Sequence, residues 1–255
     1  MVKKWNVKIP QLSGDAERRT YVYLPDSYSK KPERRYPVMY MFDGHNVFFD
    51  SDATYGKSWG MGKYMQKSKK QMIIVAVECN HKGNGRLQEY SPVTFENGTL
   101  GKIRGRGRTY MKWLVETLKP YIDENYRTLP DRGNTYLCGS SMGGLMALYG
   151  VTAFNHVFQR AACLSPSLWI SPAQMLEMVA KATIRPDTCI YMDYGSRELG
   201  NHTGNMEILN SMTQMLIIKG AFLTFRIVPG GEHSEASWEK QIPLFMECLG
   251  IRGEE

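Results

Sequence analysis

The chain has 255 residues, of which 42% are hydrophobic and 22% are charged. These proportions are close to the averages of globular proteins, so they exclude a disordered or fibrous class. The length suits one large domain or two small ones, and it allows a sizeable core without disulfides or metal ions. No apolar run approaches the roughly 20 residues that span a bilayer, so we expect no membrane partner.

The five cysteines are spaced without a CxxC pair and fall mostly within apolar stretches. Cysteines in such surroundings are typical of small buried residues in a reducing compartment, rather than of disulfides or zinc ligands. The first six residues lead into charged sequence without the apolar region of a signal peptide. Together these features predict a cytoplasmic protein.

The net charge of +7 is distributed unevenly. Residues 1–36 hold nine Lys or Arg against four Asp or Glu, and residues 81–108 hold six against two. Such clusters are either solvated surfaces or attraction sites for acidic ligands. No nucleic-acid-binding motif accompanies them, so nucleic acid is not an expected partner. We expect the first cluster to be solvated and only the second, which follows a predicted strand, to lie near an active site.

Predicted strands and helices alternate along the chain. Apolar runs rich in β-branched and aromatic residues predict strands at 21–24, 38–42, 72–77, 135–138, 160–164, 189–192 and 223–228. Apolar residues at helical spacing predict helices at 110–126, 145–151, 206–218 and 237–249. Continuously apolar strands are typical of parallel sheets covered on both faces. We therefore predict a single α/β domain over residues 1–255, with a doubly wound, mostly parallel sheet and helices on both faces.

Residues 139–144 contain a G-x-S-x-G motif with Ser141 at its centre, between a predicted strand and a predicted helix. A nucleophile elbow requires this setting, because the sharp turn lifts the serine hydroxyl clear of the sheet. The alternative is a plain Gly/Ser turn without chemistry. We predict that Ser141 is a catalytic nucleophile; Ser140 lies off the centre of the motif.

A serine hydroxyl needs a base to act at neutral pH. Behind such an elbow the chain order is serine, acid, histidine, which leaves His202 and His233. His233 follows the last predicted strand, where an α/β sheet gathers its active site, so we predict it as the base. Two carboxylates follow the strand at 189–192. We favour Glu198, which has more freedom to reach the histidine, and keep Asp193 as the alternative.

An oxyanion hole needs two backbone N–H groups that point at the developing negative charge. We predict the N–H of Met142, directly after the nucleophile, and the N–H of His45, in the loop after the strand at 38–42. Asn46 is the second choice for the loop donor. His45 has no partner ligands at useful spacing in the sequence, so we expect no metal site there.

Six segments spread over nearly the whole chain carry a family resemblance: residues 21–25, 36–44, 86–92, 139–144, 164–169 and 230–238. In this order they resemble the putative-esterase branch of the α/β-hydrolase superfamily, which includes esterase D, feruloyl and acetyl-xylan esterases, mycolyltransferases and siderophore esterases. The resemblance implies an α/β-hydrolase fold and a serine hydrolase without metal or organic cofactor. It places the acid in a Gly-x-x-acid loop, which maps onto Glu198. It also makes Trp169 a candidate substrate contact.

We therefore expect a serine carboxylic-ester hydrolase with a Ser141–His233–Glu198 triad and an acyl-enzyme. Its expected partners are small acyl or aryl esters, or oligosaccharides that carry acetyl or feruloyl esters. Three alternatives stay open: a siderophore (catecholate trilactone) esterase, an acyltransferase with the same triad, and an inactive binding module on the same scaffold. The sequence does not predict the oligomeric state.

Overall fold

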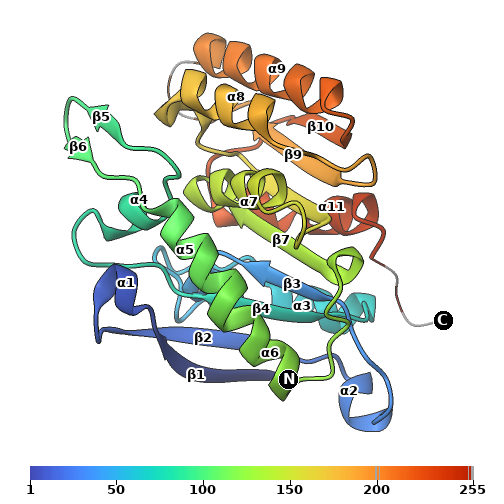
Figure 1. Ribbon diagram of the computed structural model, residues 1–255. Helices are drawn as coiled ribbons and strands as arrows, with labels where there is room; N and C mark the ends of the chain where they lie inside the picture. Colours follow the sequence, from blue (N-terminus) through green and yellow to red (C-terminus); the bar gives the residue numbers. More distant parts are fainter. Residues whose placement is uncertain (199, 201, 252, 254–255) are drawn as a thin grey trace.

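The fold is built around a central sheet of eight strands (Figure 1). The computed structural model describes residues 1–198, 200, 202–251 and 253. The strands of this sheet are β1 (Val2–Lys8), β2 (Glu17–Tyr23), β3 (Val38–Met41), β4 (Ile73–Val77), β7 (Thr135–Ser140), β8 (Arg160–Leu164), β9 (Cys189–Gly195) and β10 (Phe222–Val228). A separate hairpin is formed by β5 (Phe95–Asn97) and β6 (Gly101–Ile103).

The order of the strands across the sheet is β1-β2-β4-β3-β7-β8-β9-β10. Strand β2 runs antiparallel to both of its neighbours, β1 and β4, and the remaining pairs are parallel. Parallel neighbours need a crossover connection, and most of the helices lie in these crossovers. The carboxyl ends of six parallel strands, from β4 to β10, therefore meet along one edge of the sheet.

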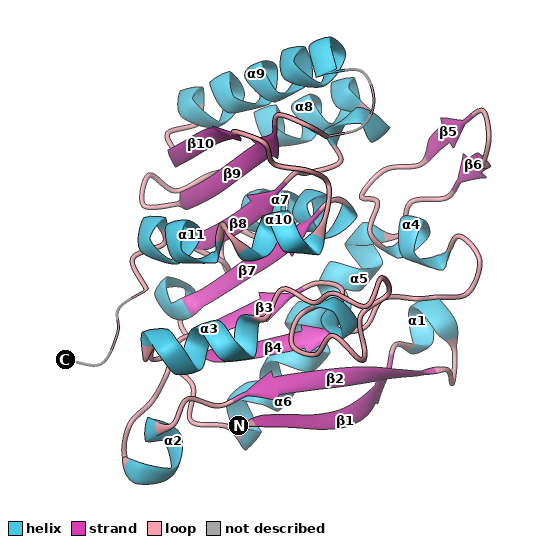
Figure 2. Ribbon diagram, turned by 180° about the vertical axis from the view of Figure 1, so that it is seen from behind, coloured by secondary structure: helices cyan, strands magenta, loops and turns pink. Residues whose placement is uncertain are grey.

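Helices cover both faces of the sheet. The α-helices are α1 (Pro10–Ser13), α2 (Ser27–Lys30), α3 (Met61–Ser68), α4 (Gly85–Glu89), α5 (Gly107–Trp113), α6 (Lys119–Asn125), α7 (Met142–Ala153), α8 (Pro172–Lys181), α9 (His202–Ile218), α10 (Glu235–Glu239) and α11 (Ile242–Cys248). Helices α5 to α9 lie on the face seen in Figure 1, and α3, α10 and α11 on the face seen from behind in Figure 2. Short 3₁₀ turns are η1 (Gly44–Asn46), η3 (Arg132–Asn134) and η4 (Leu168–Ile170), and the π-helical η2 (Leu114–Leu118) joins α5 to α6.

Two hydrophobic cores form because successive strand residues point to opposite faces. In β4, Val75 packs with residues of α5, α7 and α9, whereas its neighbours Ile74 and Ala76 pack with residues of α3 and α11. A strand of this kind has to be apolar at every position, which explains the uninterrupted run that predicted it.

Prolines alter two of the predicted helices. The helix predicted at 110–126 contains the π turn η2, because Pro120 at the start of α6 has no N–H to continue the helical ladder. The helix predicted at 237–249 is divided into α10 and α11. Pro243 stands in the first turn of α11. The N–H groups of a first turn make no hydrogen bond within the helix, so a proline is tolerated there. The segment at 110–126 therefore stays helical through its π turn, as predicted, whereas the prediction of a single helix at 237–249 was wrong.

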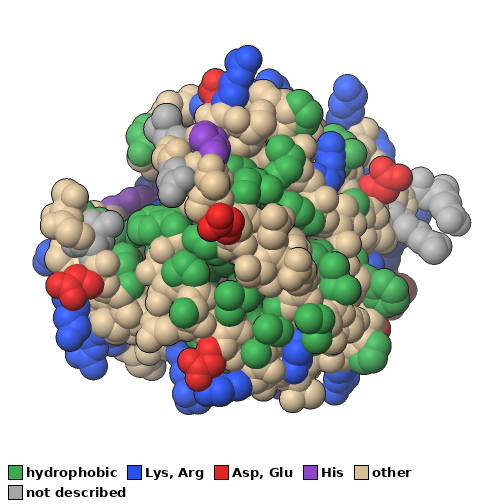
Figure 3. Space-filling model, turned by 90° about the horizontal axis from the view of Figure 1, so that it is seen from above, with side chains coloured by type: hydrophobic (Ala, Val, Ile, Leu, Met, Phe, Trp, Pro, Cys, Tyr) green, Lys and Arg blue, Asp and Glu red, His purple; other side chains and the backbone are tan. Residues whose placement is uncertain are grey.

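The end of the sheet formed by α9 and β10 carries exposed hydrophobic side chains (Figure 3). Ile217, Ile218 and Phe222 are each more than half exposed. None of the helices in the described ranges combines the length and the apolar character that crossing a bilayer requires.

Candidate active site

Ser141 occupies the sharp turn between β7 and α7. Its backbone lies at φ 58° and ψ −122°, a conformation that costs a non-glycine residue on the order of 1–3 kcal/mol. Two hydrogen bonds to the segment after β8 hold the turn: the Ser141 N–H donates to the Leu164 carbonyl at 2.9 Å, and the Ser167 N–H donates to the Ser141 carbonyl at 3.1 Å. The turn therefore has the strained strand-to-helix geometry that a nucleophile elbow requires.

Two neighbouring turns share this strain. Asp43, after β3, has φ 54°, and Ser165, after β8, has φ 43°. Since β3, β7 and β8 are adjacent in the sheet, three left-handed non-glycine residues stand side by side along its carboxyl edge. Backbone outliers of this kind concentrate at functional sites, where the surrounding structure maintains them.

The glycines of the motif are required by close backbone contacts. A Cβ atom on Gly139 would lie 2.5 Å from the carbonyl carbon of Gly143. A Cβ atom on Gly144 would lie 2.7 Å from the carbonyl oxygen of Leu164. A side chain at either position would therefore force α7 away from the sheet and displace Ser141.

The two predicted oxyanion donors lie at the starts of helical turns. Met142 is the first residue of α7, so its N–H has no acceptor within that helix. His45 lies in η1, directly after β3. A Cβ atom on Gly44 would lie 2.7 Å from the backbone of Ala76, so the loop that carries His45 packs closely against β4. Both residues stand at the carboxyl edge of the sheet beside Ser141.

His233 is paired with Glu198. Its ring Nδ1 lies 3.0 Å from Oε2 of the carboxylate, and its ring rests edge-on against Trp238, with centroids 5.0 Å apart. The Glu198 side chain is buried, whereas the His233 ring is about one-third exposed. With Glu198 ionised, Nδ1 carries the proton, which leaves Nε2 as an acceptor.

The other oxygen of Glu198 is held by two donors. The Gly195 N–H donates to Oε1 at 2.8 Å, and the Ser165 hydroxyl also donates to Oε1. The Trp238 indole N–H in turn donates to the Ser165 hydroxyl at 3.0 Å. Burial alone would raise the pKa of Glu198, but the hydrogen bonds from His233, Ser165 and Gly195 outweigh it and hold the pKa below its ordinary value. The carboxylate is therefore kept ionised and oriented toward His233.

Asp193, the alternative acid, lies in a different environment. It is buried at the end of β9, where the Tyr191 hydroxyl donates to it at 2.9 Å and the Ser165 N–H at 3.2 Å. Burial raises the pKa of Asp193 to about 7, although these hydrogen bonds act in the opposite direction. Of the two carboxylates, Glu198 is the one that contacts the His233 ring.

The Ser141 hydroxyl lies 3.3 Å from the hydroxyl of Ser167. Ser141 and His233 line the same two hollows, one on each side of the serine. Within the described ranges no hydrogen bond joins Ser141 to His233. Catalytic hydrogen bonds of this type often tighten only when substrate is bound.

The first of these hollows, about 360 Å³ in volume, is here called the apolar hollow. Beyond Ser141 and His233 it is lined chiefly by Leu87, Met142, Trp169, Tyr194, Ile208 and Leu209. Trp169 is half exposed and meets Phe95 of the β5–β6 hairpin edge-on, with ring centroids 6.3 Å apart. An aromatic rim above an apolar lining suits the acyl or aryl part of an ester.

The second hollow, about 450 Å³ in volume, is here called the polar hollow. Beyond the same two residues it is lined chiefly by His45, Asn46, Thr54, Cys79, His81 and Glu235. Asn46, the second choice as oxyanion donor, donates through its side chain to Glu235 at 3.0 Å. The predicted loop donor His45 therefore lies on the polar side of Ser141.

Arg86 lines both hollows and belongs to the basic segment 81–108. It forms a bidentate ion pair with Asp43, whose two carboxylate oxygens each lie 2.8 Å from a guanidinium nitrogen. Burial would raise the pKa of Asp43, but the Arg86 charge holds it below its ordinary value. At the site, the positive charge of Arg86 is therefore offset by the negative charge of Asp43.

Sequence reasoning did not single out Ser165, Ser167 or the Arg86–Asp43 pair. Ser165 and Ser167 fall within the segment 164–169 that carried part of the family resemblance, and this was the available signal. Arg86 and Asp43 also fall within such segments, but only the fold brings them together.

Comparison with known proteins places this geometry in a family. A family model described as "Putative esterase" matches residues 13–246. The chain belongs to this esterase family. The expected class of enzyme, a carboxylic ester hydrolase, is thereby confirmed.

Two curated proteins are similar to this esterase. The uncharacterized protein YbbA of Bacillus subtilis (strain 168) is 24% identical over 184 residues, which are 71% of this chain and 69% of that protein. The endo-1,4-beta-xylanase/feruloyl esterase of Xylanibacter ruminicola is 30% identical over 128 residues, which are 49% of this chain and 16% of that protein.

Solved structures are similar to the esterase over nearly its whole length. The BES protein from Bacillus cereus has a TM-score of 0.73 at 21% identity, covering 100% of this chain and 95% of its own. A ferulic acid esterase has a TM-score of 0.72 at 17% identity, covering 98% and 97%. The enterobactin and salmochelin hydrolase IroE has a TM-score of 0.65 at 20% identity, covering 99% and 95%. These likenesses confirm the expected α/β-hydrolase fold.

Proposed function

We propose that the esterase is a serine hydrolase in which Ser141, His233 and Glu198 form the catalytic triad. The observation that carries this proposal is the 3.0 Å contact between the His233 Nδ1 and Glu198 Oε2 atoms, at a hollow that Ser141 also lines. The strained turn at Ser141 supports the role of nucleophile. We further propose that the chain is a single α/β-hydrolase domain working in the cytoplasm.

The proposed reaction has two steps. The Ser141 hydroxyl attacks the ester carbonyl while Nε2 of His233 takes its proton, and the resulting imidazolium is stabilised by Glu198. His233 then gives this proton to the leaving alcohol, which departs as the acyl-enzyme forms. In the second step His233 takes a proton from water as the water oxygen attacks the acyl-enzyme. His233 then gives this proton to the Ser141 oxygen as the acyl–oxygen bond breaks, which releases the acid and restores the free enzyme.

The negative charge of each tetrahedral intermediate falls on the former carbonyl oxygen. The N–H groups of Met142 and His45 are the proposed donors to it. This role is supported by their position at the starts of α7 and η1, on the carboxyl edge of the sheet beside Ser141.

The proposed substrates are small acyl or aryl esters, including acetyl or feruloyl groups linked to carbohydrate. The apolar lining and the partly exposed Trp169 support an aromatic or short aliphatic acyl group. The names of the xylanase/feruloyl esterase relative and of the ferulic acid esterase structure are consistent with this class.

A substrate panel tests the proposal. Wild type and Ser141→Ala are assayed with p-nitrophenyl acetate, methyl ferulate, acetylated xylo-oligosaccharide and a catecholate trilactone. We expect hydrolysis of the first two by the wild type alone, and labelling of the wild type, but not of Ser141→Ala, by a fluorophosphonate. A folded wild type that neither hydrolyses any ester nor reacts with the probe would establish the inactive binding module. Preferential hydrolysis of the trilactone would replace the feruloyl class by the siderophore class, and new esters formed with added sugars would identify an acyltransferase.

A further inference from the structure

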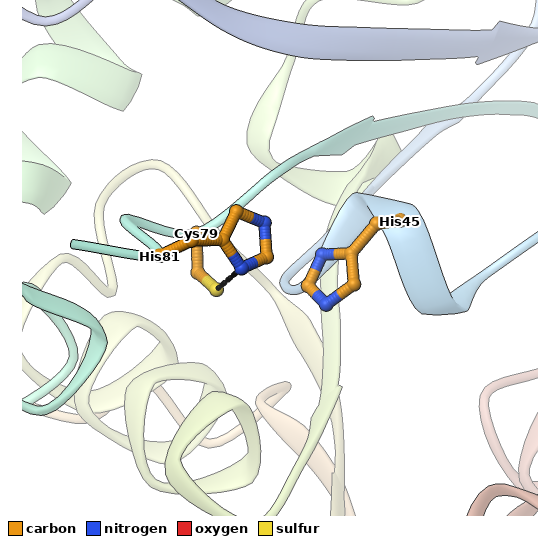
Figure 4. Close-up of side chains that lie close together, drawn as sticks. All are labelled: His45, Cys79 and His81. Atoms are coloured by element: carbon orange, nitrogen blue, oxygen red, sulfur yellow. Dashed lines mark hydrogen bonds between the residues drawn. The ribbon is translucent and has the colours of Figure 1, made fainter. Parts of the chain in front are cut away.

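Three side chains that can bind a metal ion come together in the polar hollow, which His233 also lines. His45 follows β3, and Cys79 and His81 follow β4. Because β3 and β4 are parallel neighbours, their carboxyl ends meet and bring the three residues side by side. One donor atom from each residue lies within 4.8 Å of the other two, and Figure 4 shows the three side chains facing one another.

His45 has a ring nitrogen without a partner. Its Nε2 lies 3.0 Å from the Thr54 hydroxyl. The residue is only 5% exposed, so solvent does not reach Nδ1 freely. This atom is buried and has no hydrogen-bond partner among the described residues. This atom is on the edge of the ring that faces Cys79 and His81 in Figure 4. A buried imidazole nitrogen that accepts no hydrogen bond is costly unless it binds something else.

The Thr54 contact suits a metal ligand. Histidines that bind metals almost always use their second ring nitrogen to donate a hydrogen bond, which fixes the tautomer and the orientation of the ring. When Nε2 donates to Thr54, the lone pair of Nδ1 is free and points at the other two residues.

Cys79 and His81 are already in contact. The Cys79 Sγ lies 3.9 Å from Nδ1 of His81, and the His81 ring packs edge-on against that of His45, with centroids 4.6 Å apart. In tetrahedral zinc sites, with bonds of about 2.0–2.3 Å, neighbouring ligand atoms lie about 3.3–3.8 Å apart. The three donor atoms are therefore close to the spacing that one ion requires, and a small rotation of the exposed His81 side chain would complete it.

We propose that His45, Cys79 and His81 bind one thiophilic divalent metal ion, with Zn²⁺ as the expected occupant. Two imidazoles and one thiolate are ligands that Zn²⁺ prefers, whereas Mg²⁺ and Ca²⁺ prefer oxygen. The ion displaces the proton of the Cys79 thiol, which leaves to solvent as the sulfur–metal bond forms. Its fourth position faces the polar hollow, where water completes the coordination.

The charged side chains around the proposed site favour a cation. Asp43 and Glu78 each act on the His45 ring with negative charge, and Arg86 with positive charge. Arg86 forms a bidentate pair with Asp43, so these two charges largely offset each other and Glu78 leaves one net negative charge. A bound Zn²⁺ with one thiolate would add one positive charge and balance it.

Metal binding is tested on the untagged full chain. Zn²⁺ is titrated in competition with a chromophoric chelator, and Co²⁺ is used as a spectroscopic substitute. We expect one Zn²⁺ per chain and, for Co²⁺, a thiolate-to-metal absorption band together with the visible bands of tetrahedral coordination. Absence of stoichiometric Zn²⁺ binding by the folded wild type would overturn the proposal.

Variants locate the site. His81→Gln and Cys79→Ser should weaken Zn²⁺ binding at least about 100-fold, because each removes a direct ligand. The matched controls His156→Gln and Cys248→Ser should bind Zn²⁺ like the wild type. Unchanged affinity in His81→Gln, or loss of affinity in a control, would contradict the site. Because Cys79 is buried, its serine variant is judged only if its thermal unfolding matches that of the wild type; His81 is exposed, so His81→Gln decides the outcome in either case.

Discussion

The two hollows beside Ser141 share the nucleophile, the base and Arg86, yet they differ in almost everything else. The apolar hollow has Trp169 and the aliphatic Ile208 and Leu209 of α9 in its lining, side chains that exclude water and pack against apolar groups. The polar hollow is lined by imidazoles, a thiol and the two carboxylates of Asp43 and Glu235, side chains that can bind ions and protons. This difference is what separates the two proposals: an ester group is assigned to the apolar hollow and a metal ion to the polar hollow beside the same serine.

The largest effect should come from the residue that both hollows share. Ser141→Ala should lower kcat about 10⁴-fold or more, because it removes the proposed nucleophile. Ser140→Ala, one residue earlier in β7, is the control and should stay within about tenfold of the wild type. The measurement is kcat on p-nitrophenyl acetate, and comparable losses in the two variants would assign the effect to folding rather than to the nucleophile.

The next effect distinguishes the two candidate acids, Asp193 in β9 and Glu198 after it. Glu198→Gln should lower kcat/KM about 10²- to 10⁴-fold, because it removes the charge that stabilises the His233 imidazolium. Asp193→Asn should have a much smaller effect, since Asp193 contacts Tyr191 and Ser165 rather than His233. Steady-state kinetics on both variants check this, and a reversed order of losses would make Asp193 the acid.

A smaller effect, on KM for an aromatic ester, should distinguish residues of the apolar hollow from residues of the polar hollow. Trp169→Ala should raise KM for methyl ferulate about tenfold, because an aromatic contact is worth about 1–1.5 kcal/mol, and leave KM for methyl butyrate nearly unchanged. The control is Tyr55→Ala, an exposed aromatic residue at the polar hollow. If Tyr55→Ala discriminated between the two esters as strongly as Trp169→Ala, the two hollows would not differ in the way described.

Zinc should act from the polar side. An ion bound by His45, Cys79 and His81 places positive charge in a hollow that His233 lines, and so disfavours the imidazolium that the reaction needs. We expect saturating Zn²⁺ to lower kcat of the wild type severalfold and to leave His81→Gln unaffected. Equal inhibition of the two proteins would mean that zinc acts elsewhere on the esterase.

The smallest effect concerns stability and pH. Asp193 has a pKa of about 7 in the folded chain, above the value of about 3.9 in an unfolded chain. The folded state therefore binds the proton more tightly, and its stability falls as pH rises from about 4 through 7. Between pH 5 and 8 the free energy of unfolding should fall by about 2–3 kcal/mol at most from this group. Thermal unfolding of the wild type and of Asp193→Asn over this pH range measures the change. The stability of the asparagine variant should depend less on pH.

Much of the sheet could be predicted because its middle strands are apolar at every position. Strand β1 was missed because its side chains are charged or only partly buried, and the β5–β6 hairpin because its strands are too short for a periodic signal. Helix α8 was missed although Ser171 precedes it and Pro172 is its first residue, a common start of a helix. The π turn before Lys119 and the division between Glu239 and Ile242 depend on single prolines in otherwise helical patterns.

The site residues proposed from sequence were those with local signals. Ser141 has a motif, and His233 and Glu198 follow strands in the expected order. The support for Glu198 from Ser165 and Trp238 could not be predicted, because it joins segments far apart in the chain. The grouping of His45 with Cys79 and His81 was likewise hidden, since the ligands come from separate strands and show no recognisable spacing.

The strained backbone at Asp43, Ser141 and Ser165 has a consequence for laboratory evolution. Glycine would relieve the backbone strain at each of these positions, because it adopts positive φ without steric cost. Selection for heat resistance alone would therefore favour glycine at these three strand ends, and each such gain would remove a side chain that holds or performs the chemistry. A library screened for stability and turnover together should retain all three residues, and the positions at which the two screens disagree would map the site without any prior assignment.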